Sequence, residues 1–215
     1  MSEKKGPKSL EKLLLTGFDP FGGESINPAS EAVLDLDGKT INGCKIIAEE
    51  IPTVYGKSAE KVKELIDGER PDVVLHIGQA NGTHGIRVER VALNIDDARI
   101  EDNEGNKPED EIIVDDGPTA YWTTIPTRRI VEEVKEEGIP SYLSYSAGTF
   151  VCNHVIYSTA DHVEKNDLPI HYGFIHVPFL PEQAVDKDNK PPSMAKDTIK
   201  KALHVTIETI VQEAK

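Results

Sequence analysis

Short apolar segments alternate with segments of helical periodicity along almost the whole chain, and this alternation constrains the fold more than any other feature. Runs of strand length are followed by stretches in which apolar residues recur every three to four positions, a pattern typical of helices packed on a sheet. The order predicts an α/β protein with a mainly parallel or mixed sheet and helices on both faces. The predicted strands are 12–16, 45–51, 72–77, 86–95, 141–146 and 170–177, and the predicted helices are 28–36, 57–67, 127–137, 152–165 and a last one capped by Ser193.

The polar stretch 100–117, IEDNEGNKPEDEIIVDDG, interrupts this alternation. It is too long for a simple connection between two elements. We expect either a functional loop or a small excursion that contains a short strand at 112–114.

The composition limits the classes of partner. Of the residues, 38% are hydrophobic and 29% charged, as in an ordinary globular protein. The formal net charge of −14 argues against nucleic acid and anionic membranes as partners. No apolar run approaches the ~20 residues that a membrane-spanning helix needs, and the polar N-terminus lacks an apolar signal core. We expect a flexible tail at 1–11, one domain at 12–215 and a cytoplasmic location, which also fits two cysteines, Cys44 and Cys152.

Four loops or residues with chemical potential follow predicted strands. They are the glycine- and aromatic-rich segment 17–23, the segment 78–82, Cys152 and His176. Open α/β sheets place their sites at the carboxyl ends of strands, so we expect these features to meet at one edge of the sheet.

Cys152 is the candidate nucleophile. The segment SYSAGTFVCNHVIYS predicts a strand, a tight turn at Ala147–Gly148 and then a helix. A thiol in the first helical turn faces unpaired backbone N–H groups and the positive end of the helix dipole, which favour the thiolate. The alternative is a small buried apolar residue, the usual role of a lone cysteine.

A cysteine nucleophile requires a base, and His176 is the best-placed histidine. His154 is two positions from Cys152 and points to another face of the helix. His76 lies inside a predicted strand and is expected in the core. The other histidines are a loop residue, His84, and the ordinary surface or half-buried residues His162, His171 and His204.

The group that orients this base is either Glu89 or one of Asp96 and Asp97. Glu89 alternates in phase with Val91 and other apolar residues, so it is expected on an apolar face, where an unpartnered carboxylate is costly. Its partner could equally be Arg87 or Arg90, which would make it a structural ion pair.

Four sequence signatures resemble pyroglutamyl peptidase I, a cysteine peptidase family. They are LLTGFDPFGG, IRVERVALNIDDARI around Glu89, SAGTFVCN around Cys152 and GFIHVPFLPEQ around His176, in the family's order. The resemblance covers nearly the whole chain from Leu13. One departure is Asn81–Gly82–Thr83, where the family often has Gly-Gly-Arg or Pro-Gly-Arg.

The resemblance implies a cysteine exopeptidase that removes N-terminal pyroglutamyl residues from peptides through a thioacyl-enzyme intermediate. It implies a triad of Cys152, His176 as base and acid, and Glu89 as orienter. It also implies a single catalytic domain with an α/β/α fold similar to purine nucleoside phosphorylases, and a homotetramer.

The pocket for a pyroglutamyl group should be apolar with a few polar contacts, because the lactam is small and uncharged. The resemblance places Phe18, Phe21, Gln79 and Phe150 near the ring. The alternative for the phenylalanines is the core. The backbone N–H of Cys152 and, by resemblance, the side chain of Arg99 are the candidate oxyanion donors; Arg99 could equally pair with Asp96 or Asp97.

No cofactor is implied. The chain has no paired CxxC, HxxxH, GxGxxG or phosphate-binding loop with Lys-Ser/Thr, and no metal is expected. Two rival functions are a nucleoside phosphorylase or hydrolase, which would need basic residues at the strand ends, and a binding protein without catalysis, which would have lost one of the three triad residues.

Overall fold

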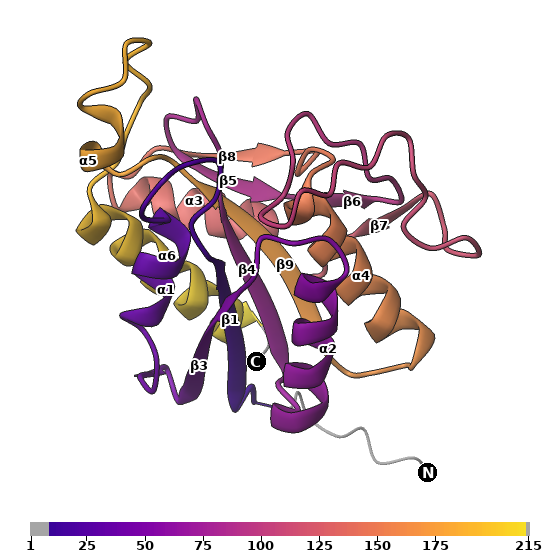
Figure 1. The fold of residues 1–215 in the computed structure, drawn as a ribbon. Coiled ribbons are helices and arrows are strands. Elements are labelled where there is room, and N and C mark those ends of the chain that lie inside the picture. Colours follow the sequence, from indigo (N-terminus) through magenta and orange to yellow (C-terminus); the bar gives the residue numbers. More distant parts are fainter. Residues whose placement is uncertain (1–8, 214–215) are drawn as a thin grey trace.

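A seven-stranded mixed sheet forms the centre of the protein, here described by a computed structural model that covers residues 9–213 (Figure 1). Its strand order is β2-β3-β1-β4-β9-β5-β8. Neighbouring strands are parallel except for β2 with β3 and β5 with β9. The strands are β1 Lys12–Phe18, β2 Thr40–Ile41, β3 Cys44–Ile51, β4 Val73–Gln79, β5 Ile86–Glu89, β8 Ser141–Ser144 and β9 His171–Val177.

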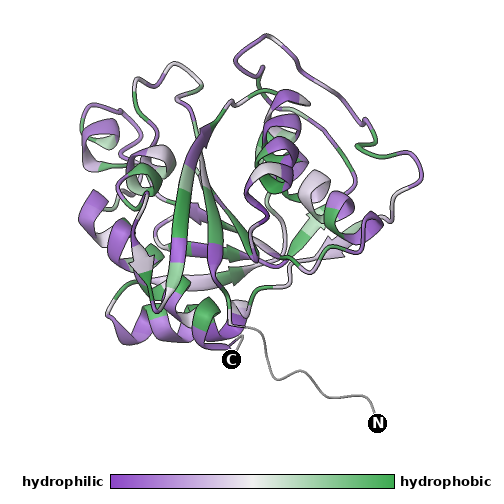
Figure 2. Ribbon diagram, turned by 90° about the horizontal axis from the view of Figure 1, so that it is seen from below, coloured by the Kyte–Doolittle hydropathy of each residue, from purple (hydrophilic) through white to green (hydrophobic). Residues whose placement is uncertain are grey.

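Helices cover both faces of this sheet. On one face α1 (Pro28–Leu34), α3 (Thr127–Glu136) and α6 (Lys196–Glu213) pack with a core that includes Leu13, Leu15 and Leu75. On the other, α2 (Lys57–Glu69) and α4 (Val151–Lys165) pack with a core that includes Leu14 and Phe174. Figure 2 shows the strands largely apolar and the helices polar on their outer sides. The predicted fold class is confirmed: successive residues of a strand face opposite sides, so a strand covered on both faces is apolar throughout.

The strand expected at 86–95 is wrong as a single element. The chain leaves the central sheet after Glu89, and β6 (Val91–Leu93) pairs instead with β7 (Ala120–Trp122) in a separate two-stranded sheet. The buried side-chain amide of Asn153 stabilises the backbone of β6 in this position away from the central sheet. Its Oδ1 accepts a hydrogen bond from the N–H of Leu93 (2.9 Å), and its Nδ2 donates to the carbonyl of Ile95 (2.9 Å). A hydrophobic run could not reveal a bend made by a side chain about 60 residues away.

Two further expectations are corrected by tertiary contacts. No strand forms at 112–114; the excursion is held by one isolated bridge, Asp96 with Glu111, and by the Asn94 side chain, which accepts from the N–H of Val114 (2.9 Å). Ser193 does not cap the last helix: it forms a bridge with Phe179, and α6 begins at Lys196. A short helix, α5 (Pro181–Ala184), also follows β9.

Most of the tail expected at 1–11 lies outside the described residues. Of the part inside them, Leu10 is buried, and the backbone N–H of Glu11 donates to the carboxylate of Asp72 (2.8 Å). Within residues 9–213, no helix combines the length and the apolar character that crossing a bilayer requires.

Candidate active site

Two neighbouring strands, β5 and β9, carry the candidate side chains Glu89 and His176 on one face of the sheet. His176 of β9 lies opposite Gly78 of β4 and opposite Arg87 of β5, and Phe174 lies opposite Glu89. Directly opposite residues, and residues two apart on a strand, point to the same side. This register therefore brings Arg87, Glu89 and His176 together on the face covered by α4.

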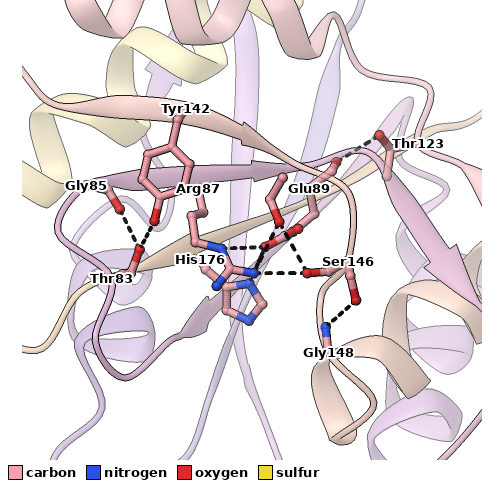
Figure 3. Close-up of polar contacts among 10 residues, drawn as sticks. Thr83, Gly85, Arg87, Glu89, Thr123, Tyr142, Ser146, Gly148 and His176 are labelled. Carbon is pink, nitrogen blue, oxygen red and sulfur yellow. Dashed lines mark hydrogen bonds and ion pairs between the residues drawn. The ribbon is translucent and has the colours of Figure 1, made fainter.

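Glu89 contacts one partner from each of the two roles that the sequence left open: His176, which it would orient, and Arg87, one of the two arginines considered for an ion pair. Its Oε1 lies 2.7 Å from Nδ1 of His176 and 2.9 Å from Nη2 of Arg87 (Figure 3). The side chain of Glu89 is 1% exposed and that of His176 is 4% exposed. The orienting contact and the ion pair thus share one oxygen atom, and neither excludes the other.

Cys152 lies above the same face, in the first turn of α4, as expected. The helix begins at Val151 with Phe150 as its N-cap residue. A Cβ atom on Gly78 would lie 3.1 Å from Sγ of Cys152 and 2.7 Å from the ring of Phe174. Only glycine at this position lets the start of α4 approach β4 so closely.

The helix start was expected to favour the thiolate of Cys152, but the influences that raise the pKa of this thiol are larger than those that lower it. Burial, and after it the negative charge of Glu89, raises the pKa of Cys152 to about 12, while its backbone hydrogen bond and Arg87 act in the opposite direction. The cost of removing a thiolate from water exceeds what the helix N-terminus supplies. The thiol of Cys152 is therefore neutral at neutral pH.

A cavity of about 260 Å³ opens over Cys152 and His176. That volume is below the ~300–1,000 Å³ of sites for drug-sized ligands, so it suits a small group. Three of the residues expected near the substrate ring line this cavity: Phe21, Gln79 and Phe150. The rings of Phe21 and Phe150 have centroids 6.0 Å apart.

Phe18 is not among the residues that line this cavity. It ends β1 rather than lying in the following loop, it is 1% exposed, and its ring packs against Phe174 at 6.3 Å between centroids. Phe18 is thus a buried core residue at the end of β1.

A chain of amides fixes which end of Gln79 is the donor. The carbonyl oxygen of Gln183 accepts from the backbone N–H of Leu180 (3.0 Å), so its Nε2 must be the atom that donates to Oε1 of Gln79 (3.0 Å). Nε2 of Gln79 in turn donates to Oδ1 of Asn81 (3.1 Å). Since an amide NH₂ carries two hydrogens, one remains for a ligand in the cavity.

Arg99 lines the cavity beside Ile100, on the long loop. Two hydrogen bonds tie this loop to the residue before the N-cap of α4: the N–H of Asp97 donates to the carbonyl of Thr149 (3.0 Å), and the Thr149 hydroxyl donates to the carbonyl of Asp97 (2.7 Å). Among residues 9–213, Arg99 forms no ion pair with Asp96 or Asp97.

The remaining histidines near the site have other partners. His76 is fully buried between the hydroxyls of Thr16 (2.7 Å) and Thr159 (3.0 Å), as expected of a core residue. His154 faces away from the cavity, with Nδ1 2.7 Å from Asp96 and Nε2 accepting from the N–H of Gly56 (3.2 Å). Asp96 is therefore engaged elsewhere and does not reach His176.

The site residues do not all come from carboxyl ends of parallel strands. Because β5 is antiparallel to β9, and β8 is parallel to β5, these two strands run against β1, β4 and β9. Glu89 is beside His176 through this antiparallel register. The expected convergence is present, but strand direction is not its cause.

Other residues of the site were not found from the sequence. Ala80, Asn81, Ile100, Ala147 and Gly148 also line the cavity, as does Arg87. Asn81, Ala147 and Gly148 belong to segments that the sequence had already marked as turns, and Gln183 ends the GFIHVPFLPEQ signature. No group of three or more His, Cys, Asp or Glu side chains in the described part of the chain is arranged to hold a metal ion.

Comparisons with known proteins identify the family. Residues 11–213 match the model of the pyroglutamyl peptidase family. A pyrrolidone-carboxylate peptidase of Bacillus mycoides is 52% identical over 203 residues, which are 94% of each chain. The crystal structure of pyroglutamyl peptidase I from Bacillus amyloliquefaciens has a TM-score of 0.92 at 47% identity and covers 95% of this chain and 98% of its own. A mutant pyrrolidone carboxyl peptidase from the hyperthermophile Pyrococcus furiosus has a TM-score of 0.91 at 44% identity, over 94% of this chain and 99% of its own. The chain therefore belongs to the pyroglutamyl peptidase family of cysteine peptidases.

Proposed function

We propose that this protein hydrolyses the amide bond after an N-terminal pyroglutamyl residue with Cys152 as nucleophile, His176 as general base and acid, and Glu89 as the group that orients His176. The observation that carries these roles is the contact of 2.7 Å between Glu89 and Nδ1 of His176, in a cavity that also contains Cys152. A carboxylate on Nδ1 leaves Nε2 for the thiol and supports the imidazolium that forms during reaction.

The reaction balances with these three groups. His176 accepts the thiol proton as Sγ attacks the scissile carbonyl carbon, and then donates it to the leaving amine as the C–N bond breaks. The product is a thioacyl enzyme and a shortened peptide. Water, deprotonated by His176, then attacks the thioester; the thiol is restored and pyroglutamic acid is released.

The oxyanion of each tetrahedral intermediate requires hydrogen-bond donors. The backbone N–H of Cys152 lies in the first turn of α4, where N–H groups have no partner within the helix. Arg99 is the second proposed donor, since this residue lines the same cavity and has no ion-pair partner among the described residues.

Recognition of the ring is proposed for Phe21 and Phe150, which would enclose it, and for Gln79, whose free N–H would donate to the lactam carbonyl. Free glutamate or glutamine at the N-terminus would bring an ammonium group between these rings without a compensating charge, which is unfavourable. Contact of Phe18 with the ring remains a prediction.

The test uses a pyroglutamyl anilide and peptides that begin with pyroglutamate or glutamine. Cys152→Ala should lose at least about three orders of magnitude in rate with an unchanged fold. Cys44→Ser is the matched control, because Cys44 is buried and lies outside the cavity. More than about a tenth of the activity in Cys152→Ala, or comparable cleavage of the glutamine peptide, would contradict the proposal.

Four wider properties are also proposed. Residues 12–215 form the single catalytic domain, and four copies assemble as a homotetramer, as the family resemblance implies. The location is cytoplasmic, which the two free thiols support. The charge of −14 supports the absence of nucleic acid and membrane partners.

A further inference from the structure

We propose that Arg87 is a positioning residue of the reaction: it balances the charge of Glu89 beside His176, and it ties the loop before the nucleophile to the triad. The proposal rests on the function proposed above. It concerns a residue that the sequence offered only as a structural partner of Glu89.

Arg87 holds Glu89 by two nitrogens. Its Nε donates to Oε1 of Glu89 (3.1 Å), and its Nη2 lies 2.9 Å from the same oxygen. The side chain of Arg87 is 25% exposed and lines the cavity, whereas Glu89 is 1% exposed. The ion pair is therefore mostly shielded from water. Coulomb interactions are stronger in the protein interior than at the surface.

Glu89 has few other sources of stabilisation. Its second oxygen, Oε2, is buried and accepts no hydrogen bond within residues 9–213. Without Arg87, His176 would be the only remaining hydrogen-bond or ion-pair partner of the Glu89 carboxylate among residues 9–213. An isolated buried carboxylate favours a positive charge on its neighbour, and a protonated imidazole cannot accept the proton of Cys152. Arg87 supplies that positive charge permanently, because a guanidinium does not titrate in the working range.

The same guanidinium reaches the loop that leads to Cys152. Nη2 of Arg87 donates to the carbonyl of Ser146 (2.9 Å) and to the hydroxyl of Ser144 (3.2 Å). The hydroxyl of Ser146 accepts from the N–H of Gly148 (3.1 Å), which lines the cavity with a φ of +84°. Figure 3 shows this path from Glu89 through Arg87 to Ser146 and Gly148.

The charged and titratable groups around this pair are few. Cys152 on α4 and Arg99 on the long loop share the cavity with Arg87 and His176. On the neighbouring strand β8, Tyr142 lies directly opposite Arg87. The hydroxyl of Tyr142 is hydrogen-bonded to the hydroxyl of Thr83, and its ring stacks on the ring of His84 with centroids 5.3 Å apart. Glu89 is the acidic group in direct contact with Arg87, so neutralising Arg87 should act through it.

The experiment measures kcat/KM of a pyroglutamyl anilide from pH 5 to 9 for the wild type, Arg87→Gln and Arg87→Lys. Arg90→Gln is the matched control: it removes a nearby arginine that stacks on Trp122 (5.2 Å) and does not contact Glu89. The acidic limb of kcat/KM reports the protonation of the free enzyme. In Arg87→Gln this limb should move to higher pH by about one unit, so that the loss of activity is roughly tenfold greater at pH ~6 than at pH ~8.5.

Arg87→Lys separates the charge from the tie to the loop. Lysine keeps the charge but cannot make the same set of bonds, so its acidic limb should stay in place while kcat falls at every pH. Arg90→Gln should keep both the limb and the rate. Circular dichroism and melting curves verify that each variant is folded.

Three outcomes would overturn the proposal: a fall in Arg87→Gln that is equal at all pH values, activity in Arg87→Gln equal to that of the wild type, or a shifted acidic limb in a folded Arg87→Lys. The last outcome decides the matter even if Arg87→Gln does not fold. Failure of the proposed function is distinguishable, because it would appear in the wild type and Cys152→Ala before any Arg87 variant is made.

Discussion

His76 should make this protein lose stability at mildly acidic pH. The imidazole is fully buried between the hydroxyls of Thr16 and Thr159, and burial lowers its pKa from 6.5 to about 3. Between those two values the unfolded chain binds a proton at His76 and the folded chain does not. The free energy of unfolding therefore rises with pH in this window and falls as pH drops below ~6.5.

The magnitude follows from the two pKa values. Going from pH 7 to pH 5, the contribution of His76 to the free energy of unfolding falls by about 2 kcal/mol. His76→Gln keeps hydrogen-bonding capacity toward both threonines but does not titrate. The variant is expected to be less stable at pH 7, since glutamine fills the site less well, yet to lose about 2 kcal/mol less than the wild type on acidification.

Urea unfolding curves at pH 7, 6 and 5 measure how the free energy of unfolding changes with pH in the wild type and in His76→Gln. His204→Gln is the control, because His204 is about half exposed and should leave the slope nearly unchanged. If wild type and His76→Gln lose equal stability between pH 7 and 5, His76 is protonated in the folded protein and the argument from burial is wrong.

Three further changes test the packing around the site. Gly78→Ala should lower kcat by tenfold or more while substrate still binds, because the new methyl group would lie 2.7 Å from the ring of Phe174 and 3.1 Å from Sγ of Cys152. An unchanged kcat in steady-state kinetics would refute this. Asn153→Ala should destabilise the fold by roughly 2–4 kcal/mol, because it removes the hydrogen bonds that hold β6; urea denaturation measures this, and a loss below about 1 kcal/mol would count against it. Gln183→Glu should raise KM roughly tenfold with a smaller change in kcat, because a carboxylate cannot donate to Gln79 and no longer fixes its donor end; an unchanged KM would separate Gln183 from recognition.

The central elements could be predicted because their signals are local. The run 72–77 contains four apolar residues, Val73, Val74, Leu75 and Ile77, and corresponds to β4 (Val73–Gln79), which is buried at every position. Asn27 and Pro28 mark the start of α1 in the sequence, and in the structure Oδ1 of Asn27 accepts from the N–H of Ala29 (2.9 Å). The elements that were missed, such as β7 and the break after Glu89, have weak local signals and are held by partners far along the chain.

For the candidate site, the sequence by itself determined which groups are available: a thiol at a helix start, a histidine late in an apolar strand and a carboxylate in an apolar phase. Only the tertiary structure decided how they are combined. In the structure, β5 runs antiparallel to β9, and one oxygen of Glu89 contacts both His176 and Arg87. Phe18 is buried in the core, and burial is the largest influence on the pKa of Cys152. The reason is physical: periodicity and capping depend on residues a few positions apart, whereas burial and charge depend on every neighbour in space, and His176 is 87 residues from Glu89.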